Sequence, residues 1–438
     1  MSENMKNSPK LRFPEFVNNG EWEEQELGKL GKFLGGGTPS KSVDEYWHGT
    51  IPWISSSDIN EDDLKTISIT RFINEKSVLE SATKIVPKES VLFVSRVGTG
   101  KLAINSIDLC TSQDFTNFIP IQIYNYFLGY YFLANKSALT SLDQGTSIKG
   151  FSKSDLEKFK LTYPKKKEEQ QKITDCLSSV DSLIFAQSKK VELLKEHKKG
   201  LMQQLFPQDG EEVPKLRFPE FVNGVKWEEE KLSEIYTFKV TNSFSRDKLN
   251  YDSGLVKNIH YGDIHTKFST LFDIEKENVP FINSSISLEK TKDDCYCQES
   301  DMIFADASED LEDVGKSIEI VNLNNEKLLS GLHTLQARQK ESKFITGFGG
   351  YLFKSNKIRA QIKKESQGTK VLSISGTRLS NIDISYPKKK EEQQKIADCL
   401  NSVDEQISSQ SQKLQTLKEH KKALMQQLFP HNKEITNE

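Results

Sequence analysis

The sequence has no long apolar run, no excess of positive charge and few cysteines. None of its hydrophobic stretches approaches the ~20 residues of a membrane-spanning helix, and the first ten residues, MSENMKNSPK, have no apolar core, so we expect neither a transmembrane segment nor a signal peptide. The formal net charge is −3. Tight nucleic-acid binding through bulk positive charge is therefore not expected, and a phosphate-binding surface would have to be a local patch. The five cysteines are an odd number, for which reduced thiols in a cytosol are the simplest interpretation.

Motifs of the common enzyme classes are also missing. Residues 98–101 resemble the end of a phosphate-binding loop, but Ser95 and Leu102 stand where Gly and Ser or Thr are required. Cys295 and Cys297 have no second Cys or His pair at zinc spacing. The seven histidines form no HExxH motif, and no Gly-rich cofactor loop or adenine-methyltransferase NPPY-like motif is present. The sequence predicts no catalytic centre, no metal site and no cofactor bound by this chain.

An internal repeat dominates what the sequence does contain. Residues 163–207 and 386–430 are identical at 34 of 45 aligned positions, and both begin with YPKKKEEQQKI. The nonapeptide PKLRFPEFV occurs at residues 9–17 and 214–222, and Trp22 and Trp227 follow it in register. The stretches between, residues 31–143 and 236–366, differ heavily. This pattern indicates that the same partner is held twice while two different ligands are recognised.

A seam of apolar residues at coiled-coil spacing runs along both repeated segments. Eight of its ten positions are apolar in each copy, over more than four heptads. The polar exceptions recur at equivalent places, Gln187 with Gln410 and Lys198 with Lys421. They either fix the register or orientation of the helices or mark a wet part of the seam. The seam positions are Ile173, Leu177, Val180, Ile184, Gln187, Val191, Leu194, Lys198, Leu201 and Leu205 in the first copy and Ile396, Leu400, Val403, Ile407, Gln410, Leu414, Leu417, Lys421, Leu424 and Leu428 in the second.

The fold class that these patterns predict is α+β. Short β-like runs separated by Gly, Ser and Asn turns indicate two mixed α/β domains, joined by two long antiparallel coiled-coil helices with pseudo-two-fold symmetry. We expect variable domains over residues 1–162 and 208–385, helical regions over 163–207 and 386–430, and a tail over 431–438. A helix of this length would span roughly 58 Å and act as a ruler between the domains.

Matching loops of the two variable domains carry unlike side chains. Residues 95–101 read SRVGTGK, whereas residues 305–316 read ADASEDLEDVGK, so an acidic loop replaces a basic one. Variation confined to equivalent loops is typical of two surfaces that recognise different ligands. If the ligand is DNA, the side chains of Arg and Lys suit the edge of guanine, those of Asn and Gln suit the edge of adenine, and those of Asp or Glu can accept a hydrogen bond from cytosine. For each single residue, the alternative is an ordinary solvated loop charge.

A repeated Gln-Gly-Thr, at residues 144–146 and 367–369, joins each variable half to its helix. It is either a phosphate-binding turn, helped by a nearby lysine, or simply a turn before a strand. The candidate DNA-contacting residues are Ser56, Ser57, Arg96, Thr99, Lys101, Gln113, Asp114, Thr146 and Lys149 in the first half and His260, His265, Lys267, Asp306, Lys316, His333, Arg338, Thr369 and Lys370 in the second.

The chain resembles the specificity subunit of type I restriction–modification systems over about residues 9–430. The resemblance rests on LRFPEF followed by Trp in both halves, on GGTPS at residues 36–40 with IPWISSSDI at 51–59, and on the YPKKKEEQQKI that opens both helical regions. GGTPS and IPWI have no counterpart in the second half, so the resemblance indicates its ligand-contacting loops less specifically.

The resemblance implies a cytoplasmic, non-catalytic subunit for DNA methylation and phage defence. Two target-recognition domains would each read half of an asymmetric bipartite site on double-stranded DNA, and the helices would set the spacer and dock two adenine-N6 methyltransferase subunits. S-adenosylmethionine would belong to those subunits, and ATP and magnesium to a restriction subunit that joins them. The alternatives are a stand-alone sequence-specific DNA-binding regulator and a coiled-coil scaffold whose heads bind proteins.

Overall fold

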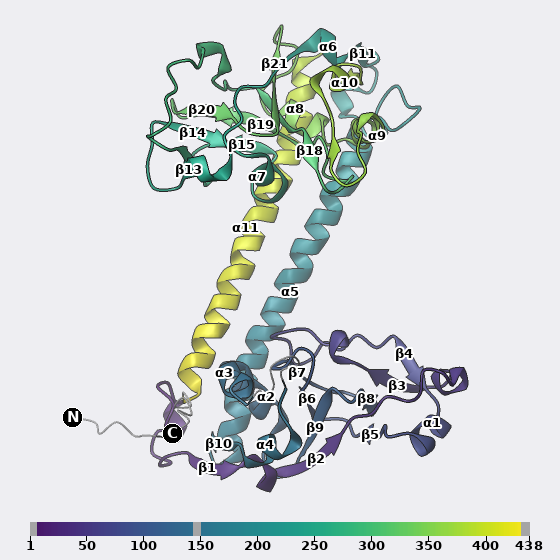
Figure 1. Cartoon of the computed structure of the whole chain (residues 1–438), viewed down its shortest axis with the longest axis vertical. Helices are drawn as coiled ribbons and strands as arrows, with labels where there is room; N and C mark the ends of the chain where they lie inside the picture. The colour runs from purple at the N-terminus through teal and green to yellow at the C-terminus, as the bar shows by residue number, and fades with distance from the viewer. Residues whose placement is uncertain (1–6, 143–149, 431–438) are drawn as a thin grey trace, which may run out of the picture. The chain divides into compact units, whose positions relative to one another are not determined.

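A computed structural model describes residues 7–142 and 150–430 of the chain (Figure 1). The chain divides into two compact units, one formed by the residues up to Lys189 together with those from Ser411 onward, the other by Lys190–Gln410. Each unit therefore holds one variable domain, the first half of the long helix that follows this domain, and the second half of the other long helix. Among the described residues, no helix is long and apolar enough to cross a membrane.

Two four-stranded sheets and one two-stranded ribbon form the first unit. The central strand β6 is the apolar run VLFV, which is buried on both faces, as expected for a strand packed between two layers. The first sheet has the order β2 (Gly31–Gly35), β9 (Phe115–Pro120), β6 (Val91–Val94) and β7 (Leu102–Ile104); the second has β4 (Arg71–Ile73), β3 (Ile51–Ile54), β8 (Leu109–Thr111) and β5 (Ile85–Val86); the ribbon pairs β1 (Glu23–Glu26) with β10 (Lys160–Tyr163).

The second unit repeats the core of this topology with different residues and with additional strands. In both units the second sheet contains one parallel pair, β3 with β8 and β14 with β20. The first sheet here has β12 (Tyr236–Lys239), β21 (Thr334–Gln339), β17 (Met302–Ala305), β19 (Ser317–Asn322) and β15 (Leu271–Asp273); the second has β13 (Leu249–Asn250), β16 (Phe281–Ile282), β14 (Val256–Ile259) and β20 (Lys327–Ser330); two ribbons pair β11 (Glu228–Lys231) with β23 (Asp383–Tyr386) and β18 (Ala307–Ser308) with β22 (Leu372–Ser373).

Short helices cover the sheets, and the predicted α+β class is confirmed. Figure 1 shows α2 in the first unit and α8 in the second lying between the strands and the long helices. The helices of the first unit's domain are α1 (Glu75–Glu80), α2 (Asn125–Ala134), α3 (Lys136–Thr140) and α4 (Lys153–Lys158); those of the second are α6 (Leu232–Ile235), α7 (Tyr261–Thr266), α8 (Phe348–Leu352), α9 (Asn356–Glu365) and α10 (Gly376–Leu379).

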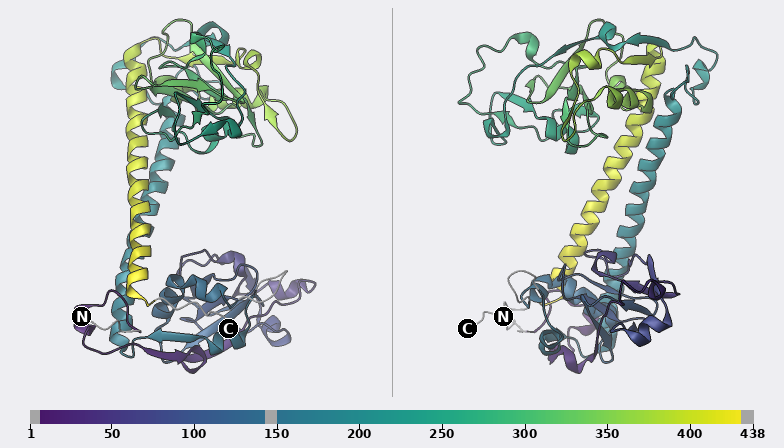
Figure 2. Two further views of the ribbon diagram at one scale, coloured as in Figure 1. Left: turned by 60° about the vertical axis from the view of Figure 1, so that its left-hand side comes forward. Right: turned by 45° about the vertical axis from the view of Figure 1, so that its right-hand side comes forward.

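The long helices are α5 (Lys167–Leu205) and α11 (Lys390–Leu428), each of 39 residues. They begin shortly after a Tyr-Pro pair and end just before a Phe-Pro pair, because proline is poorly accommodated inside a helix. Within the first unit Ile173 and Leu177 share a core with Leu424 and Leu428, so the helices run antiparallel there (Figure 2). Every position of the predicted seam is buried or half-buried in the structure.

The two lysines of the seam lie in equivalent networks. Lys421 pairs with Asp181 at 2.6 Å, and the Tyr130 hydroxyl of α2 donates to the same carboxylate at 2.6 Å. In the second unit Lys198 pairs with Asp404 at 2.6 Å, and the hydroxyl of Tyr351 in α8 donates to it at 3.0 Å. Each lysine also lies over the tyrosine ring, 5.6 Å from its centroid for Lys421 and 5.3 Å for Lys198. These networks join both helices to the domain of each unit, which favours a positional role over a merely wet seam.

The LRFPEF…W motif fastens each domain to the start of its own helix. Arg12 donates to Glu169 at 2.7 Å, and the Trp22 indole donates to the same buried carboxylate at 3.0 Å. The backbone N–H of Leu11 also donates to the carbonyl of Gln427, near the end of α11. The second unit makes the same contacts through Arg217, Trp227, Glu392, Leu216 and Gln204.

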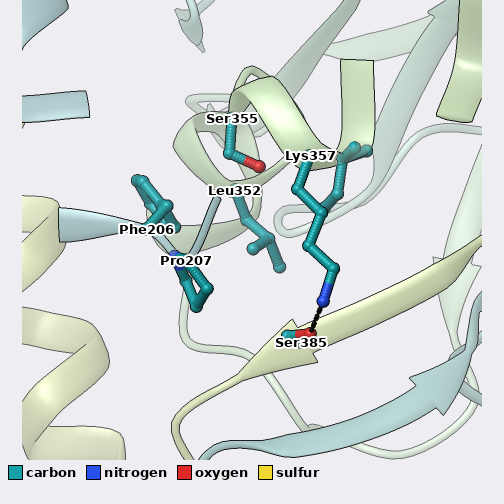
Figure 3. A pocket seen from close by; sticks show the side chains of 7 residues that line it. Phe206, Pro207, Leu352, Ser355, Lys357 and Ser385 are labelled. Carbon is teal, nitrogen blue, oxygen red and sulfur yellow. Dashed lines mark hydrogen bonds between the residues drawn. The ribbon is translucent and has the colours of Figure 1, made fainter. Parts of the chain in front are cut away.

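The Phe-Pro end of each helix is buried in the unit that contains the other domain. Phe206, at the end of α5, packs on Trp227 and Phe348 with ring centroids 6.2 and 6.1 Å apart. Figure 3 shows Phe206 and Pro207 around a small hollow, across which Lys357 donates to Ser385 at 2.9 Å. Phe429 packs in the same way on Trp22 and Phe127 in the first unit. Both repeats are therefore needed to complete either unit.

Candidate nucleic-acid interface

Three loops of the first unit meet where β3, β6 and β8 end. The backbone N–H of Ser112, after β8, donates to the carbonyl of Ile54 at 2.8 Å, which places the loop after β3 beside it. The N–H of Ser95, after β6, donates to the carbonyl of Asp114 at 2.8 Å. We call this set of loops, residues 55–58, 95–101 and 112–114, the first reading edge. It brings together Ser56, Ser57, Arg96, Thr99, Lys101, Gln113 and Asp114.

Side chains of this edge differ in exposure. Arg96 and Gln113 are exposed, whereas Thr99 and Lys101 are half-buried. The Thr38 hydroxyl, from the GGTPS segment, donates to the Gln113 carboxamide, and the Asp114 carboxylate accepts from Ser112 at 3.0 Å. These hydrogen bonds hold the loop in place, and the exposed side chains of Gln113 and Arg96 can donate hydrogen bonds to a ligand. Thr146 and Lys149 lie outside the residues that the structure describes.

The second unit brings its predicted residues together at the equivalent place. The loops after β14, β17 and β20 meet there, and the N–H of Asp306 donates to the carbonyl of His333 at 3.0 Å. The ring of Tyr261 lies 4.7 Å from that of His260 and 5.3 Å from that of His333. The second reading edge, residues 260–267, 305–316 and 331–333, thus gathers three of the seven histidines of the chain. Among the described residues, no group of His, Cys, Asp and Glu could hold a metal ion.

Two further predicted residues lie on the turn that follows Gln367. Gln367 and Ser373 exchange backbone hydrogen bonds, and the N–H of Ile374 donates to the carbonyl of Asp306 at 2.9 Å. This pairing places exposed Thr369 and Lys370 next to the second reading edge. The backbone of residues 367–369 therefore forms a turn, which is one of the two interpretations of Gln-Gly-Thr. Phosphate contact by Thr369 and Lys370 stays a prediction.

The electrostatics of the second reading edge favour a neutral His260. Burial, and after it the nearby charge of Arg246, lowers the pKa of His260. Burial works to raise the pKa of Asp263, but hydrogen bonds from Arg246 and Lys267 outweigh it and lower the pKa. The buried, neutral imidazole of His260 thus lies beside the cations of Arg246 and Lys267, and cations of this kind suit contacts to base edges and phosphates.

Arg338 and Lys316 are engaged within the protein. Arg338 lies at the far end of β21 from this edge, where its guanidinium donates to the buried Asp301 at 2.6 and 2.8 Å and to the carbonyl of Tyr296 at 2.7 Å. The structure therefore gives Arg338 an internal role in joining strands and does not bring it to the other candidates. Lys316 does lie at the edge, but its ammonium donates to the carbonyl of His265 at 2.7 Å.

Two arginines at the reading edges escaped the sequence-based prediction. Arg71, on β4, donates to the Asp58 carboxylate and to the Ser55 hydroxyl. Arg246 donates to Asp263 at 2.7 Å. The two aspartates occupy equivalent positions of the repeat, but one arginine follows its aspartate in the chain and the other precedes it. No pattern in the sequence links them, so only the fold could find this pair.

Comparison with known proteins identifies the family. Residues 19–195 and 224–419 each match the type I restriction modification DNA specificity domain, and together they cover most of the chain. The protein therefore belongs to this family and contains two copies of its domain.

Named relatives are specificity subunits of type I restriction enzymes. The MjaIX subunit of Methanocaldococcus jannaschii is 35% identical over 180 residues, 40% of this chain and 41% of the relative. The EcoR124I/EcoR124II subunit of Escherichia coli is 32% identical over 174 residues, 37% of this chain and 42% of the relative. The chain thus spans about two fifths of the length of these two relatives. The MjaVIII subunit of M. jannaschii is 25% identical over 458 residues, 99% of this chain and 97% of the relative.

Solved structures share the fold at low identity. The S subunit of a type I restriction–modification system from M. genitalium has a TM-score of 0.58 at 14% identity, covering 97% of this chain and 100% of that one. A chain from a study of complex assembly in the type I system has a TM-score of 0.53 at 16% identity, covering 92% and 96%. At such identities the likeness shows the fold alone.

Proposed function

We propose that this chain is the non-catalytic DNA-specificity subunit of a type I restriction–modification complex. One observation carries the proposal: two equivalent reading edges, built on the same strands, present different side chains. The first offers Arg96 and Gln113, the second Asp306 and His333. Two unlike edges would read two different half-sites, so the DNA target is asymmetric and split.

The near-identical helical repeats are the proposed docking surfaces for two methyltransferase subunits. Equivalent networks around Lys198 and Lys421 join helix and domain in each unit, so two copies of one partner would meet equivalent surfaces. These partners would supply S-adenosylmethionine and methylate adenine at N6. A restriction subunit with ATP and magnesium would cut unmodified DNA in the cytoplasm as a defence against phage.

The long helices would set the gap between the two half-sites. A helix of 39 residues spans roughly 58 Å at 1.5 Å per residue. One turn of B-DNA is about 34–36 Å, so helices of this length would be long enough to hold two reading edges over half-sites about a turn apart. A scaffold that only bound proteins would need no such matched pair of reading edges.

The deciding experiment maps adenine methylation across a host genome that carries this chain and its methyltransferase. A split, asymmetric motif that disappears on deletion of the chain is expected. Replacing residues 31–143 by the matching segment of a relative should then change one half of the motif and leave the other half as it was.

Two outcomes would contradict the proposal. An unchanged methylome after deletion would remove the specificity role, and a motif altered in both halves by the replacement would remove the assignment of one domain to one half-site. Tight sequence-specific binding by the isolated chain, without methyltransferase, would instead favour a stand-alone DNA-binding regulator.

A further inference from the structure

The reading edges share one device that their unlike sequences conceal. In each unit an aspartate of the edge holds an arginine, Asp58 with Arg71 in the first and Asp263 with Arg246 in the second. The aspartates are equivalent in the repeat, whereas the arginines come from different elements, β4 and the short helix Arg246–Lys248. The same pairing is therefore reached by two separate routes, which indicates that the edge requires it.

Exposure distinguishes these arginines from the structural ones. The side chains of Arg71 and Arg246 are 38% and 43% exposed, while their aspartates are 13% and 0% exposed. Arg12 and Arg217, which fasten the domains to the helices, are only 10% and 11% exposed. The carboxylate of half-buried Asp58 or of buried Asp263 thus fixes each arginine, and much of the arginine side chain still faces solvent.

Both guanidinium groups keep free donors. Arginine carries five N–H donors. Arg71 uses two of them, on Asp58 and Ser55, and Arg246 uses two, on Asp263 and Tyr251. Within residues 7–142 and 150–430, the remaining three donors of each group have no hydrogen-bond partner.

Arg71 is also held by the aromatic ring of Trp53. Its guanidinium lies 4.7 Å from the centroid of the Trp53 ring, and the Trp53 indole donates to the carbonyl of Gly37 at 2.9 Å. A side chain at Gly37 would put its Cβ 2.4 Å from the backbone of Ala82, so this close approach requires glycine. The GGTPS and IPWI segments therefore position Arg71, and a preorganised guanidinium loses little freedom on binding.

We propose that Arg71 and Arg246 are specificity-determining residues, each reading a guanine in its own half-site, and that Asp58 and Asp263 are positioning residues. The proposal rests on the proposed function. Guanine presents two acceptors, O6 and N7, in the major groove, and arginine is the side chain that most often contacts them. Arg96, exposed on the neighbouring loop, is the competing candidate in the first unit.

The test maps adenine methylation by the complete complex carrying Arg71→Ala, Arg71→Lys, Arg246→Ala or Arg246→Lys. Each alanine variant should relax one guanine position of one half-site, lowering the preference for guanine there roughly tenfold or more, and leave the other half-site unchanged. The lysine variants should relax the same position less, because lysine can still donate to guanine but lacks the fixed pair of donors. Asp58→Asn should lower methylation while keeping the same base preference. Arg96→Ala, and Arg338→Lys as an internal arginine, should not relax the position that Arg71→Ala relaxes.

Three outcomes would overturn the inference. The first is an unchanged motif in the Arg71 and Arg246 variants, and the second is weaker methylation at an unchanged motif, which is the signature of a phosphate contact. The third is relaxation of the same guanine by Arg96→Ala. The lysine variants keep the charge and guard against misfolding, which the melting temperature checks. If the wild-type complex methylates no split motif, the proposed function itself fails and this inference fails with it.

Discussion

Single buried residues make the second unit different from the first. Glu319 on β19 is 1% exposed, and its carboxylate accepts from the backbone N–H groups of Gly347 and Gly350. By the strand register its counterpart in the first unit is the apolar Ile104. Burial raises the pKa of Glu319 to about 7, although the two backbone hydrogen bonds oppose this shift. Only the second unit therefore contains this ionisable group in its sheet.

Glu319 should make the second unit less stable as the pH rises from about 4.5 to about 7. Its pKa is higher in the folded chain than in the unfolded chain, so within this window the folded chain binds more protons and loses stability with rising pH. The loss is on the order of 3 kcal/mol in the free energy of unfolding.

Hydrogen exchange of β17 and β19 peptides across this pH range, for wild type and Glu319→Gln, measures the effect. The variant should lack the decline, and β6 and β7 peptides of the first unit provide the internal control. Equal pH dependence in wild type and variant would show that Glu319 is not the cause.

At this scale the sequence predicted the positions of many loop residues but not their partners. Ser56, Gln113, His260 and His333 reach the reading edges because they follow strand ends, which turn signals reveal. Arg338 was expected among them, but the buried Asp301 engages it. Side-chain pairing depends on which elements pack together, and a single sequence does not contain that information.

At the scale of elements, the apolar seam is the feature that the sequence specified most completely. A coiled-coil period survives single substitutions, so the bounds of α5 and α11 could be predicted closely from Pro and heptad positions. The strands were harder, because short apolar runs of four residues fit several structures. The partners of the two seam lysines could not be predicted, since Asp181 and Asp404 lie on the opposite helix from each.

Leu194→Asp should disrupt the helix pair, whereas Leu193→Asp should not. Leu194 is a half-buried seam residue, and its neighbour Leu193 is 52% exposed. A charge in the seam lacks a partner and should cost at least about 2 kcal/mol. Circular dichroism melts and assembly with the methyltransferase compare the two variants, and equal melting temperatures would reject the seam assignment.

Phe206→Ala should destabilise the second unit, although Phe206 ends the helix that follows the first domain. Removing a buried phenylalanine costs about 3–5 kcal/mol, and the rings that it leaves uncovered belong to Trp227 and Phe348. Phe429→Ala should act equivalently on the first unit. Peptide-resolved hydrogen exchange should show that Phe206→Ala loosens the second unit and that Phe429→Ala loosens the first. If each variant loosened the other unit instead, the packing of each helix end on the other domain would be wrong.

On the scale of the whole molecule, the chain combines a symmetric framework with asymmetric reading edges. The core of the first sheet is alike in both units, with β2-β9-β6-β7 matching β12-β21-β17-β19, while the edge strands differ and the loops differ in length and charge. The repeat let the architecture be predicted, because two copies of one scaffold must be built alike. Which bases the loops would select under the proposed function depends on loop geometry and DNA shape, which cannot be read from the sequence.

Adding four residues to the middle of both α5 and α11 should widen the spacer of the methylated motif. Four residues add about 6 Å of helix, which corresponds to one or two base pairs. Both half-sites should keep their bases, because the reading edges are untouched. The measurement is the methylated motif of the variant complex, compared with a variant in which four exposed residues are substituted without a change of length. An unchanged spacer in the lengthened variant would exclude the helices as the ruler.

Each long helix ends in the unit that contains the other domain, and this packing constrains how far the two repeats can differ. The start of each repeat packs in one unit and its Phe-Pro end packs in the other, so each copy has to fit both halves of the protein. A repeat that changed along its whole length would lose its fit to both domains. The loops of each reading edge belong to one unit and do not have to fit the other. The loops can therefore differ between the two domains while the 45-residue repeats are identical at 34 positions.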